Sequence, residues 1–192
     1  MRFLIASDIH GSATWCERLL DVVERERPDR ILLLGDVLYH GPRNDLPEGY
    51  APKQVIAMLN PLAASIIAVR GNCEAEVDQM VLDFPCMADH STILDPTATR
   101  AADGSERATP SCELFLTHGH VYGAGFHNSV DKLPELPQGS VLLYGHTHKK
   151  VSEPAPGHDG VWAFNPGSVS IPKDGTHSCG MYEDGALRHV EL

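Results

Sequence analysis

Five short apolar segments of this chain each run directly into a polar signature, and this pattern limits the possible folds more than any other feature. The segments have the length and composition of buried β-strands. The signatures are Ser7-Asp8-Ile9-His10, Gly35-Asp36, Gly71-Asn72, Thr117-His118-Gly119-His120 and Gly145-His146-Thr147-His148. Ligands of open α/β sheets bind beyond the carboxyl ends of the strands, so one sheet is expected to bring these side chains together.

The start of the chain has the pattern of a β-α-β unit. An apolar strand is expected at residues 2–6, a helix at 13–26 with Ser12 as its N-cap, and a second strand at 30–34. Such a unit implies parallel strands joined by a right-handed crossover.

The rest of the chain alternates between further elements and loops. We expect a loop at 40–52, a helix at 53–60, a strand at 64–69, a helix at 74–83, an exposed excursion at 95–112, strands at 114–117 and 141–144, and short strands from 161 onward. With 192 residues, of which 42% are hydrophobic, the chain can fill one core. The prediction is therefore a single α/β domain over residues 1–192.

The charge balance narrows the class of partner. Acidic side chains number 26 against 15 basic ones, which gives a formal net charge of -11. Nucleic acids are bound mainly through clustered Lys and Arg, so the composition argues against a nucleic-acid partner. A small phosphorylated substrate remains compatible with this charge, because a bound metal ion could neutralise it locally.

The location predicted for the protein is the cytoplasm. No apolar run approaches the roughly 20 residues that span a membrane, and residues 1–8 read as a first strand rather than a signal peptide. The five cysteines are scattered and form no C-x-x-C pair, so neither a disulfide framework nor a thiolate metal cluster is indicated.

The residue types in the signatures are those of a transition-metal site. Carboxylates, imidazoles and one amide oxygen, without a thiolate, suit manganese, iron, zinc, cobalt or nickel. Two metals about 3.5–4 Å apart can bind the attacking and the leaving oxygen of a phosphoryl displacement. Such a pair requires a bridging carboxylate, and Asp36 could fill that role. The candidate metal ligands are Asp8, His10, Asp36, Asn72, His118, His146 and His148.

Each candidate also has an ordinary structural use. Asp8 could cap the next helix, and Asp36 and Asn72 could form turns. His146 and His148 would share one face of an extended segment and could simply lie at the surface. The joint pattern argues against these explanations, because unrelated turns would not place such residues at the ends of successive strands.

The order of the signatures resembles the calcineurin-like metallophosphoesterase superfamily. Its pattern is D-x-H, then G-D, G-N, an H-G segment and G-H-x-H, and each block has a counterpart here. Within that superfamily, residues 34–44 and 165–172 are similar to the small bacterial YfcE-type phosphodiesterases. The resemblance covers almost the whole chain and is weakest at 95–112 and 123–129.

The resemblance implies a four-layer α/β/β/α sandwich of two mixed sheets. It also implies hydrolysis of a small phosphodiester by a hydroxide that bridges two divalent metals. Manganese is the metal that we expect, with zinc, iron, cobalt and nickel as alternatives. One metal would be held by Asp8, His10, Asp36 and His148, and the other by Asp36, Asn72, His118 and His146.

One position departs from the wider superfamily. Many members have histidine directly after the G-N block, where it helps to protonate the leaving group, whereas this chain has Cys73. A neutral thiol is a poor proton donor, so substrates with good leaving groups are expected to react best. Of the other candidates, His120 could polarise the substrate, Arg43 and Asn44 in loop 40–52 could contact it, and His40 and His127 have no assigned role.

Other functions on the same fold stay open. They are a phosphomonoesterase, a nuclease and a non-catalytic scaffold. A scaffold would be marked by the loss of motif residues, and all of them are present. The net charge and the absence of Lys/Arg runs argue against a nuclease. The sequence does not decide whether the chain forms a homo-oligomer.

Overall fold

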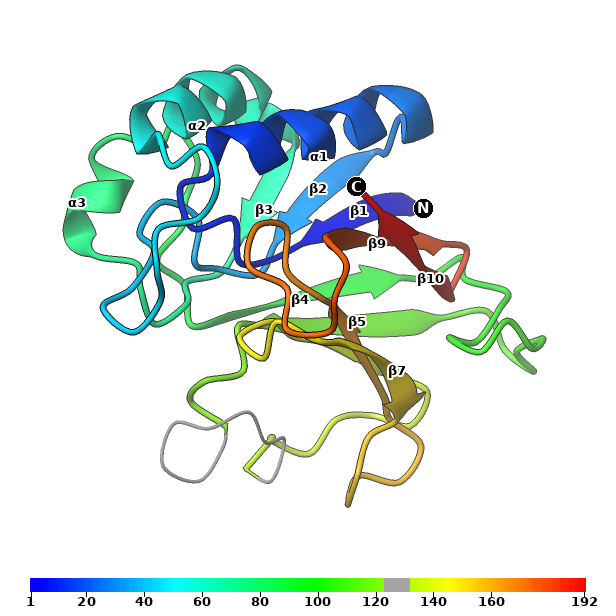
Figure 1. Ribbon diagram of the computed structural model, residues 1–192. Helices are drawn as coiled ribbons and strands as arrows, with labels where there is room; N and C mark the ends of the chain where they lie inside the picture. Colours follow the sequence, from blue (N-terminus) through cyan, green and yellow to red (C-terminus); the bar gives the residue numbers. More distant parts are fainter. Residues whose placement is uncertain (123–131) are drawn as a thin grey trace.

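The structure, a computed structural model, describes residues 1–122 and 132–192 (Figure 1). Two five-stranded mixed sheets, with strand orders β10-β9-β1-β2-β3 and β4-β5-β6-β8-β7, form its centre. The strands are β1 (Arg2–Ala6), β2 (Arg30–Leu33), β3 (Ile66–Ala68), β4 (His90–Asp95), β5 (Cys112–Thr117), β6 (Val141–Leu143), β7 (Lys150–Pro154), β8 (Trp162–Pro166), β9 (Ser178–Glu183) and β10 (Ala186–Glu191). The helices are α1 (Ala13–Glu26), α2 (Pro52–Leu59), α3 (Glu76–Gln79) and the 3-10 helix η1 (Asn60–Ser65). The segment 123–129, with His127, lies outside the described residues.

The first sheet begins with the predicted β-α-β unit. Strand β1 pairs in parallel with β2, and β2 pairs in parallel with β3, so the three carboxyl ends lie at one edge. The other edge of β1 pairs antiparallel with β9, which comes from the far end of the sequence. The unit predicted at residues 2–34 is thus confirmed, and β1 lies inside the sheet.

Helices α1 and α2 cover the outer face of the first sheet (Figure 1). The predicted N-cap of α1 is confirmed, because the Ser12 hydroxyl accepts a hydrogen bond from the Trp15 amide at 3.3 Å. The helix ends at Glu26, where Arg27 adopts a left-handed conformation. Leu19 and Val22 of α1 are buried against the sheet. No helix in residues 1–122 or 132–192 is long and apolar enough to cross a membrane.

The inner faces of the two sheets share one apolar core. Phe3 and Ile5 of the first sheet belong to the same buried cluster as Leu114 and Leu143 of the second. On the outer face of the second sheet, side chains from the loops at 132–140 and 155–161 pack on the strands. The predicted fold class, with two mixed sheets and helices outside, is confirmed. In the described part of the chain, loops rather than a helix form the fourth layer.

Two predicted elements differ from the structure for local reasons. The strand expected at 64–69 begins only at Ile66, because η1 occupies Asn60–Ser65 and has Pro61 in its first turn, where no amide partner is needed. The helix expected at 74–83 is limited to Glu76–Gln79. After it, the Gln79 side chain bonds the carbonyls of Leu82 and Phe84 and thereby holds a non-helical loop.

The excursion at 95–112 is not simply exposed, which corrects the prediction. Ala98 and Ala102, 0% and 7% exposed, pack in the core between the sheets. The Thr99 amide bonds the Asp184 carboxylate at 2.8 Å and so ties the segment to the β9–β10 turn. Strands β4 and β7 were also not predicted, because both are edge strands with many exposed side chains.

A buried hydrogen bond between the sheets generates a stability prediction. The Tyr182 hydroxyl of β9 donates to Asp95 Oδ2 of β4 at 2.9 Å, and both residues are fully buried. Tyr182→Phe should lower the free energy of unfolding by about 1–2 kcal/mol, because the buried carboxylate loses a donor. Urea unfolding measures this change. Tyr144→Phe is the control, since its hydroxyl makes no hydrogen bond to the described residues, and an equal loss in both variants would contradict the assignment.

Candidate metal centre

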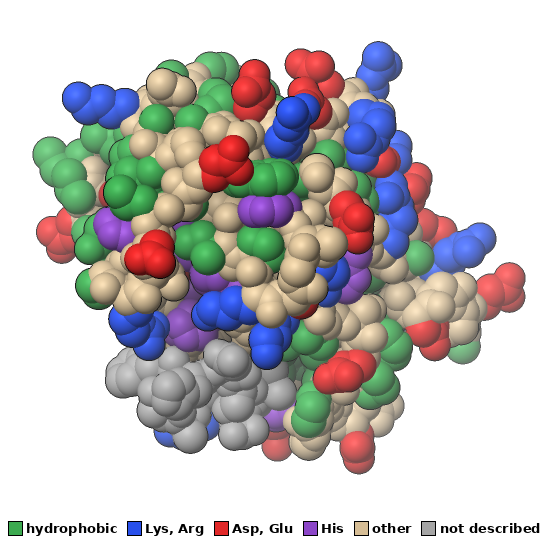
Figure 2. Space-filling model, in the orientation of Figure 1, with side chains coloured by type: hydrophobic (Ala, Val, Ile, Leu, Met, Phe, Trp, Pro, Cys, Tyr) green, Lys and Arg blue, Asp and Glu red, His purple; other side chains and the backbone are tan. Residues whose placement is uncertain are grey.

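Histidine side chains gather in a hollow on one face of the molecule, with Lys and Arg side chains around them (Figure 2). The hollow lies where the carboxyl ends of β1, β2 and β3 meet those of β5 and β6. The expectation that one sheet supplies all five signatures is therefore wrong, because β5 and β6 belong to the second sheet. The two-sheet arrangement implied by the family resemblance is the correct one.

The backbone around the site is unusual at five of the candidate ligands. Asp8, His10, Asp36, His146 and His148 have φ values of 60°, 47°, 56°, 67° and 58°. Left-handed conformations of this kind cost of order 1–3 kcal/mol each and persist only where the surroundings impose them. The expectation that His146 and His148 share a face of an extended segment is wrong, because both residues turn the chain.

Two glycines allow the ends of β2 and β3 to approach each other. Gly35 has a φ of 95°, and a Cβ atom on it would collide with the Gly71 backbone. A Cβ atom on Gly71 would in turn collide with Oδ1 of Asp36. The position of the Asp36 carboxylate therefore depends on the absence of a side chain at residue 71.

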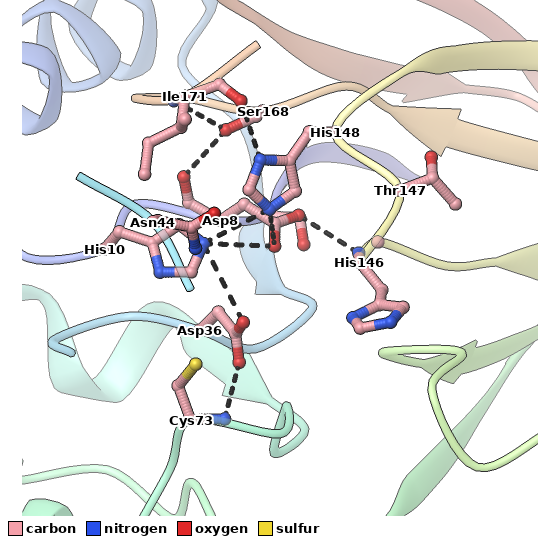
Figure 3. Close-up of polar contacts among 12 residues, drawn as sticks. Asp8, His10, Asp36, Asn44, Cys73, His146, Thr147, His148, Ser168 and Ile171 are labelled. Carbon is pink, nitrogen blue, oxygen red and sulfur yellow. Dashed lines mark hydrogen bonds and ion pairs between the residues drawn. The ribbon is translucent and has the colours of Figure 1, made fainter. Parts of the chain in front are cut away.

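One group of candidate ligands surrounds Asp8 (Figure 3). Its Oδ1 lies 3.2 Å from Nε2 of His148 and 3.6 Å from Nε2 of His10. The two Nε2 atoms are 3.3 Å apart. Asp36 closes the group, with Oδ2 at 3.8 Å from His10 Nε2. Asp8, His10 and His148 are almost fully buried, and their ligand atoms lie within 4.8 Å of one another.

A second group surrounds His118 on the other side of Asp36. His118 Nε2 lies 3.5 Å from Asp36 Oδ2, 3.1 Å from Asn72 Oδ1 and 3.2 Å from His146 Nδ1. Asp36 Oδ2 is thus the atom that lies near both groups. The seven predicted residues come together, and Asp36 occupies the position between the two groups.

Backbone carbonyl groups orient three of the imidazole rings. Nδ1 of His10, His118 and His148 each lies within hydrogen-bond distance of a carbonyl oxygen. The acceptors are Tyr39, Leu34 and Ile171, at 2.7, 2.6 and 2.6 Å. A carbonyl oxygen only accepts, so Nδ1 carries a proton in each ring, and Nε2 is the nitrogen that faces the centre. Metal-binding histidines are commonly held in this way.

Glu74 fixes the loop that carries Asp36, and the motif reasoning missed it. Its carboxylate accepts hydrogen bonds from the amides of Asp36 and Val37 at 2.9 and 2.7 Å, and also from the Gly71 amide. Burial, and then the nearby Asp36 carboxylate, raises the pKa of Glu74. The available signal was an acidic residue two positions after the Gly71-Asn72 block.

The segment 165–172 supports the other side of the site. The hydroxyls of Ser168 and Ser170 donate to the Asp8 carbonyl at 3.0 and 3.1 Å. The Asn165 amide donates to the Gly145 carbonyl at 2.8 Å. These bonds tie the first strand to the loop that precedes His146 and His148.

Burial and charge act in opposite directions on the ionisable groups. Burial tends to raise the pKa of Asp36, but His118 outweighs it and holds that pKa at about 2. Burial tends to lower the pKa of His118, but Asp36 and Asp8 raise it to about 10. The pKa of Asp8 likewise lies well below its usual value, since His148 and His10 outweigh burial. The carboxylates are therefore ionised at neutral pH.

The donor set fits a divalent transition metal. Asp8 Oδ1 is buried and accepts no hydrogen bond from the described residues. A buried carboxylate oxygen without a hydrogen bond is costly, and a cation beside it removes that cost. The surrounding donors are imidazole nitrogens and carboxylate or amide oxygens, which suit manganese, iron, zinc, cobalt or nickel.

The centre opens into a cavity of about 440 Å³. The predicted contacts Arg43 and Asn44 line it, which places them beside the candidate ligands. Sequence reasoning missed two further basic residues there, Lys149 and Lys173. Among the described residues, the lining consists of Asp36, Arg43, Asn44, Asn72, His146, Thr147, His148, Lys149 and Lys173.

Two predicted residues lie next to the ligand groups. The ring centroid of His120 is 5.4 Å from that of His118. Burial, together with His118 and His146, lowers the pKa of His120 to about 4. Cys73 offers a sulfur within 4.8 Å of ligand atoms of His10 and Asp36. Burial and the Asp36 carboxylate raise the pKa of its thiol, so both groups are neutral at pH 7.

His40 lies outside both ligand groups. Its ring makes edge contacts with Tyr39 and Tyr50, at centroid distances of 4.7 and 5.2 Å. It therefore packs against aromatic side chains.

Comparisons with known proteins find relatives over the full chain. The sequence model of the calcineurin-like phosphoesterase superfamily domain matches residues 1–184. Phosphodiesterase YfcE of Escherichia coli strain K12 is 45% identical over 193 aligned positions, covering 100% of this chain and 92% of that protein. The solved structure of YfcE, described as a phosphoesterase from E. coli, matches with a TM-score of 0.81 and 42% identity over 99% of this chain and 98% of that one. An archaeal phosphodiesterase, at 22% identity and a TM-score of 0.62 over 100% of both chains, shares the fold.

The glycine contact generates a prediction about metal binding. Gly71→Ala should displace the Asp36 carboxylate and weaken binding of a divalent metal by at least about tenfold, because a ligand leaves its position. Calorimetric titration of the metal-free protein with Mn²⁺ measures the affinity. Gly175→Ala is the control for backbone strain alone, since Gly175 has a φ of 95° and a Cβ atom there would contact nothing within 4 Å, so this variant should keep its metal affinity. Unchanged affinity in a folded Gly71→Ala protein would show that Asp36 does not bind the metal.

Proposed function

This chain belongs to the calcineurin-like phosphoesterase superfamily, and on that basis we propose that it is a metal-dependent phosphodiesterase acting on a small phosphodiester. The observation that carries the proposal is the position of the buried Asp36 carboxylate between two groups of nitrogen and oxygen donors. Similarity to the E. coli phosphodiesterase along the whole chain supports the diester as the substrate class.

We propose that the centre holds two divalent transition metals, with manganese as the metal first expected. Asp36 would bridge the two sites, because its Oδ2 lies near both donor groups. One site would consist of Asp8, His10, Asp36 and His148, and the other of Asp36, Asn72, His118 and His146. Zinc, iron, cobalt and nickel suit the same donors.

Metals bound at these residues supply positive charge that activates a water molecule and stabilises the transition state at phosphorus. The protein's own residues hold and orient the reacting groups. Carbonyl contacts fix the histidine rings, and Glu74 fixes the loop of Asp36. Arg43 and Asn44 line the cavity where the substrate would lie and are proposed to contact it.

The site lacks an effective proton donor for the leaving group at neutral pH. The two candidates are His120, whose pKa is lowered to about 4, and Cys73, whose pKa is raised. At neutral pH the first has already lost its proton and the second holds its proton too tightly. A general acid typically contributes 10²–10⁴-fold in rate. We therefore propose a preference for leaving groups that depart without a proton, such as phenols.

The other functions are less well supported. Every ligand position of the motif is filled, which argues against a non-catalytic scaffold. A net charge of -11 argues against a nuclease acting on long nucleic acids. A phosphomonoesterase remains the second candidate, and an assay with matched mono- and diesters separates the two activities. The five free cysteines support the cytoplasm as the location, and the core shared by both sheets supports a single domain.

The bridging role of Asp36 predicts the loss of both metals together. Asp36→Asn should reduce metal content from about two per chain to well below one, and should cost several powers of ten in rate. Asn72→Ala should lose chiefly one metal. Elemental analysis and hydrolysis of bis(p-nitrophenyl) phosphate measure both effects. The surface change Asp21→Asn is the control, and near-wild-type turnover of Asp36→Asn with its metals bound would contradict the bridge.

The neutral state of the Cys73 thiol predicts how the rate of hydrolysis depends on the leaving group. Cys73→Ala should have little effect, because the neutral thiol transfers no proton. Cys73→His should accelerate substrates with poor leaving groups by part of the 10²–10⁴ range, and should change nitrophenyl substrates little. Rates for a series of diesters plotted against leaving-group pKa make the comparison. An inactive Cys73→Ala protein that still holds its metals would show that the thiol takes part in the chemistry.

A further inference from the structure

We infer that the preferred substrate is a phosphodiester that carries a second phosphate on the ester arm that does not leave, and that Arg43, Lys149 and Lys173 bind this second phosphate. The inference rests on the proposed phosphodiesterase function. It concerns the rest of the substrate, beyond the diester that is cleaved.

Three cationic side chains line the same cavity as the candidate ligands Asp36, His146 and His148. Arg43 comes from the loop after β2, Lys149 from the loop after β6, and Lys173 from the loop before β9. All three residues are exposed to solvent as well as lining the cavity. Lys and Arg side chains surround the histidines on this face (Figure 2).

The backbone holds two of these residues in a fixed relation to the centre. Lys149 directly follows His148 in the chain, and the Lys173 amide donates to the His148 carbonyl at 2.9 Å. The His148 ring itself is held by the Ile171 carbonyl. The backbone of both lysines therefore lies beside His148, one of the candidate metal ligands. A substrate bound at the metal centre would meet both side chains in a reproducible geometry.

The neighbouring Lys150 differs from these three cationic residues, because its charge is paired within the protein. Its ammonium lies 3.1 Å from Asp174 Oδ1 and also bonds the Thr176 hydroxyl. Among the described residues, no carboxylate forms an ion pair with Lys149, Lys173 or Arg43. Three cations without an ion pair in residues 1–122 and 132–192 are notable in a chain with 26 acidic and 15 basic residues. Such groups are available to bind an anion.

Charge distinguishes the two anionic groups, phosphate and carboxylate, that the three cations could bind on the substrate. A diester group carries about one negative charge, and that charge would be met at the metal centre. A phosphate monoester brings about −1.5 to −2 more charge and three acceptor oxygens. Three separate cations match that group better than a carboxylate, which has about one charge and two oxygens. Guanidinium and ammonium groups are the usual protein partners of phosphate.

The test uses three diesters that share a p-nitrophenyl leaving group. The retained arm is ethyl, carboxymethyl or 2-phosphoethyl, so the bond that breaks stays the same while the charge of the arm increases. For the metal-loaded wild-type protein, KM should fall in that order, and the 2-phosphoethyl diester should gain about tenfold or more in kcat/KM over the ethyl diester.

The variant Lys149→Gln/Lys173→Gln should lose most of this preference while retaining its metal content. The charge-matched control is Arg18→Gln/Arg30→Gln, which changes two exposed side chains that do not line the cavity and should keep the preference. A preference that survives in the lysine variant would show that Lys149 and Lys173 do not bind the second phosphate, and would overturn the inference. A preference for the carboxymethyl diester over the 2-phosphoethyl one would overturn the assignment of a phosphate.

A second readout does not depend on turnover. The metal-free protein cannot use the metals to bind or cleave, so calorimetry can measure binding of the intact diesters. The 2-phosphoethyl diester should bind several-fold more tightly than the ethyl diester, and the difference should vanish in the lysine variant. Equal binding of both diesters to the metal-free wild type would overturn the inference. Failure of the loaded wild type to hydrolyse any of the three would instead reject the proposed function.

Discussion

The structure around the site depends on the burial of two carboxylates. Asp8 and Asp36 are 0% and 2% exposed, and their pKa values lie below the ordinary range because histidines surround them. Removing an ion from water costs several kcal/mol unless opposite charge and hydrogen bonds replace the solvent. Each nearby feature serves that need. The histidine rings face the carboxylates, the Cys73 amide bonds Asp36 at 2.9 Å, and the His146 amide bonds Asp8 at 3.1 Å.

This requirement also explains the relation between the sheets. The first sheet provides both carboxylates, whereas His118, His146 and His148 follow strands of the second sheet. The apolar contacts of Phe3 and Ile5 with the second sheet bring the strand ends into register, so the core that stabilises the fold also positions the site.

The sequence predicted the candidate metal ligands more completely than the pairing of the strands. Residues that bind metals at strand ends can be recognised from their types and order, and all seven candidates came together. The division into two sheets could not be derived from the strand pattern, because strand pairing is non-local: β1 lies between β2 and β9, far apart in sequence. Glu74, Lys149 and Lys173 were missed for another reason. Single charged residues in loops look alike until the fold shows which of them face the cavity.

The position of β1 also sets the order in which the molecule can form during synthesis. One edge of this apolar strand can pair with β2 soon after both leave the ribosome, but the other edge stays unpaired until β9, at residues 178–183, has been made. The Asp8 carbonyl likewise lacks its hydrogen bonds from Ser168 and Ser170 until those residues have been made. A nascent chain therefore carries an unpaired hydrophobic edge until residues 178–183 have been made, which is the kind of surface that chaperones bind.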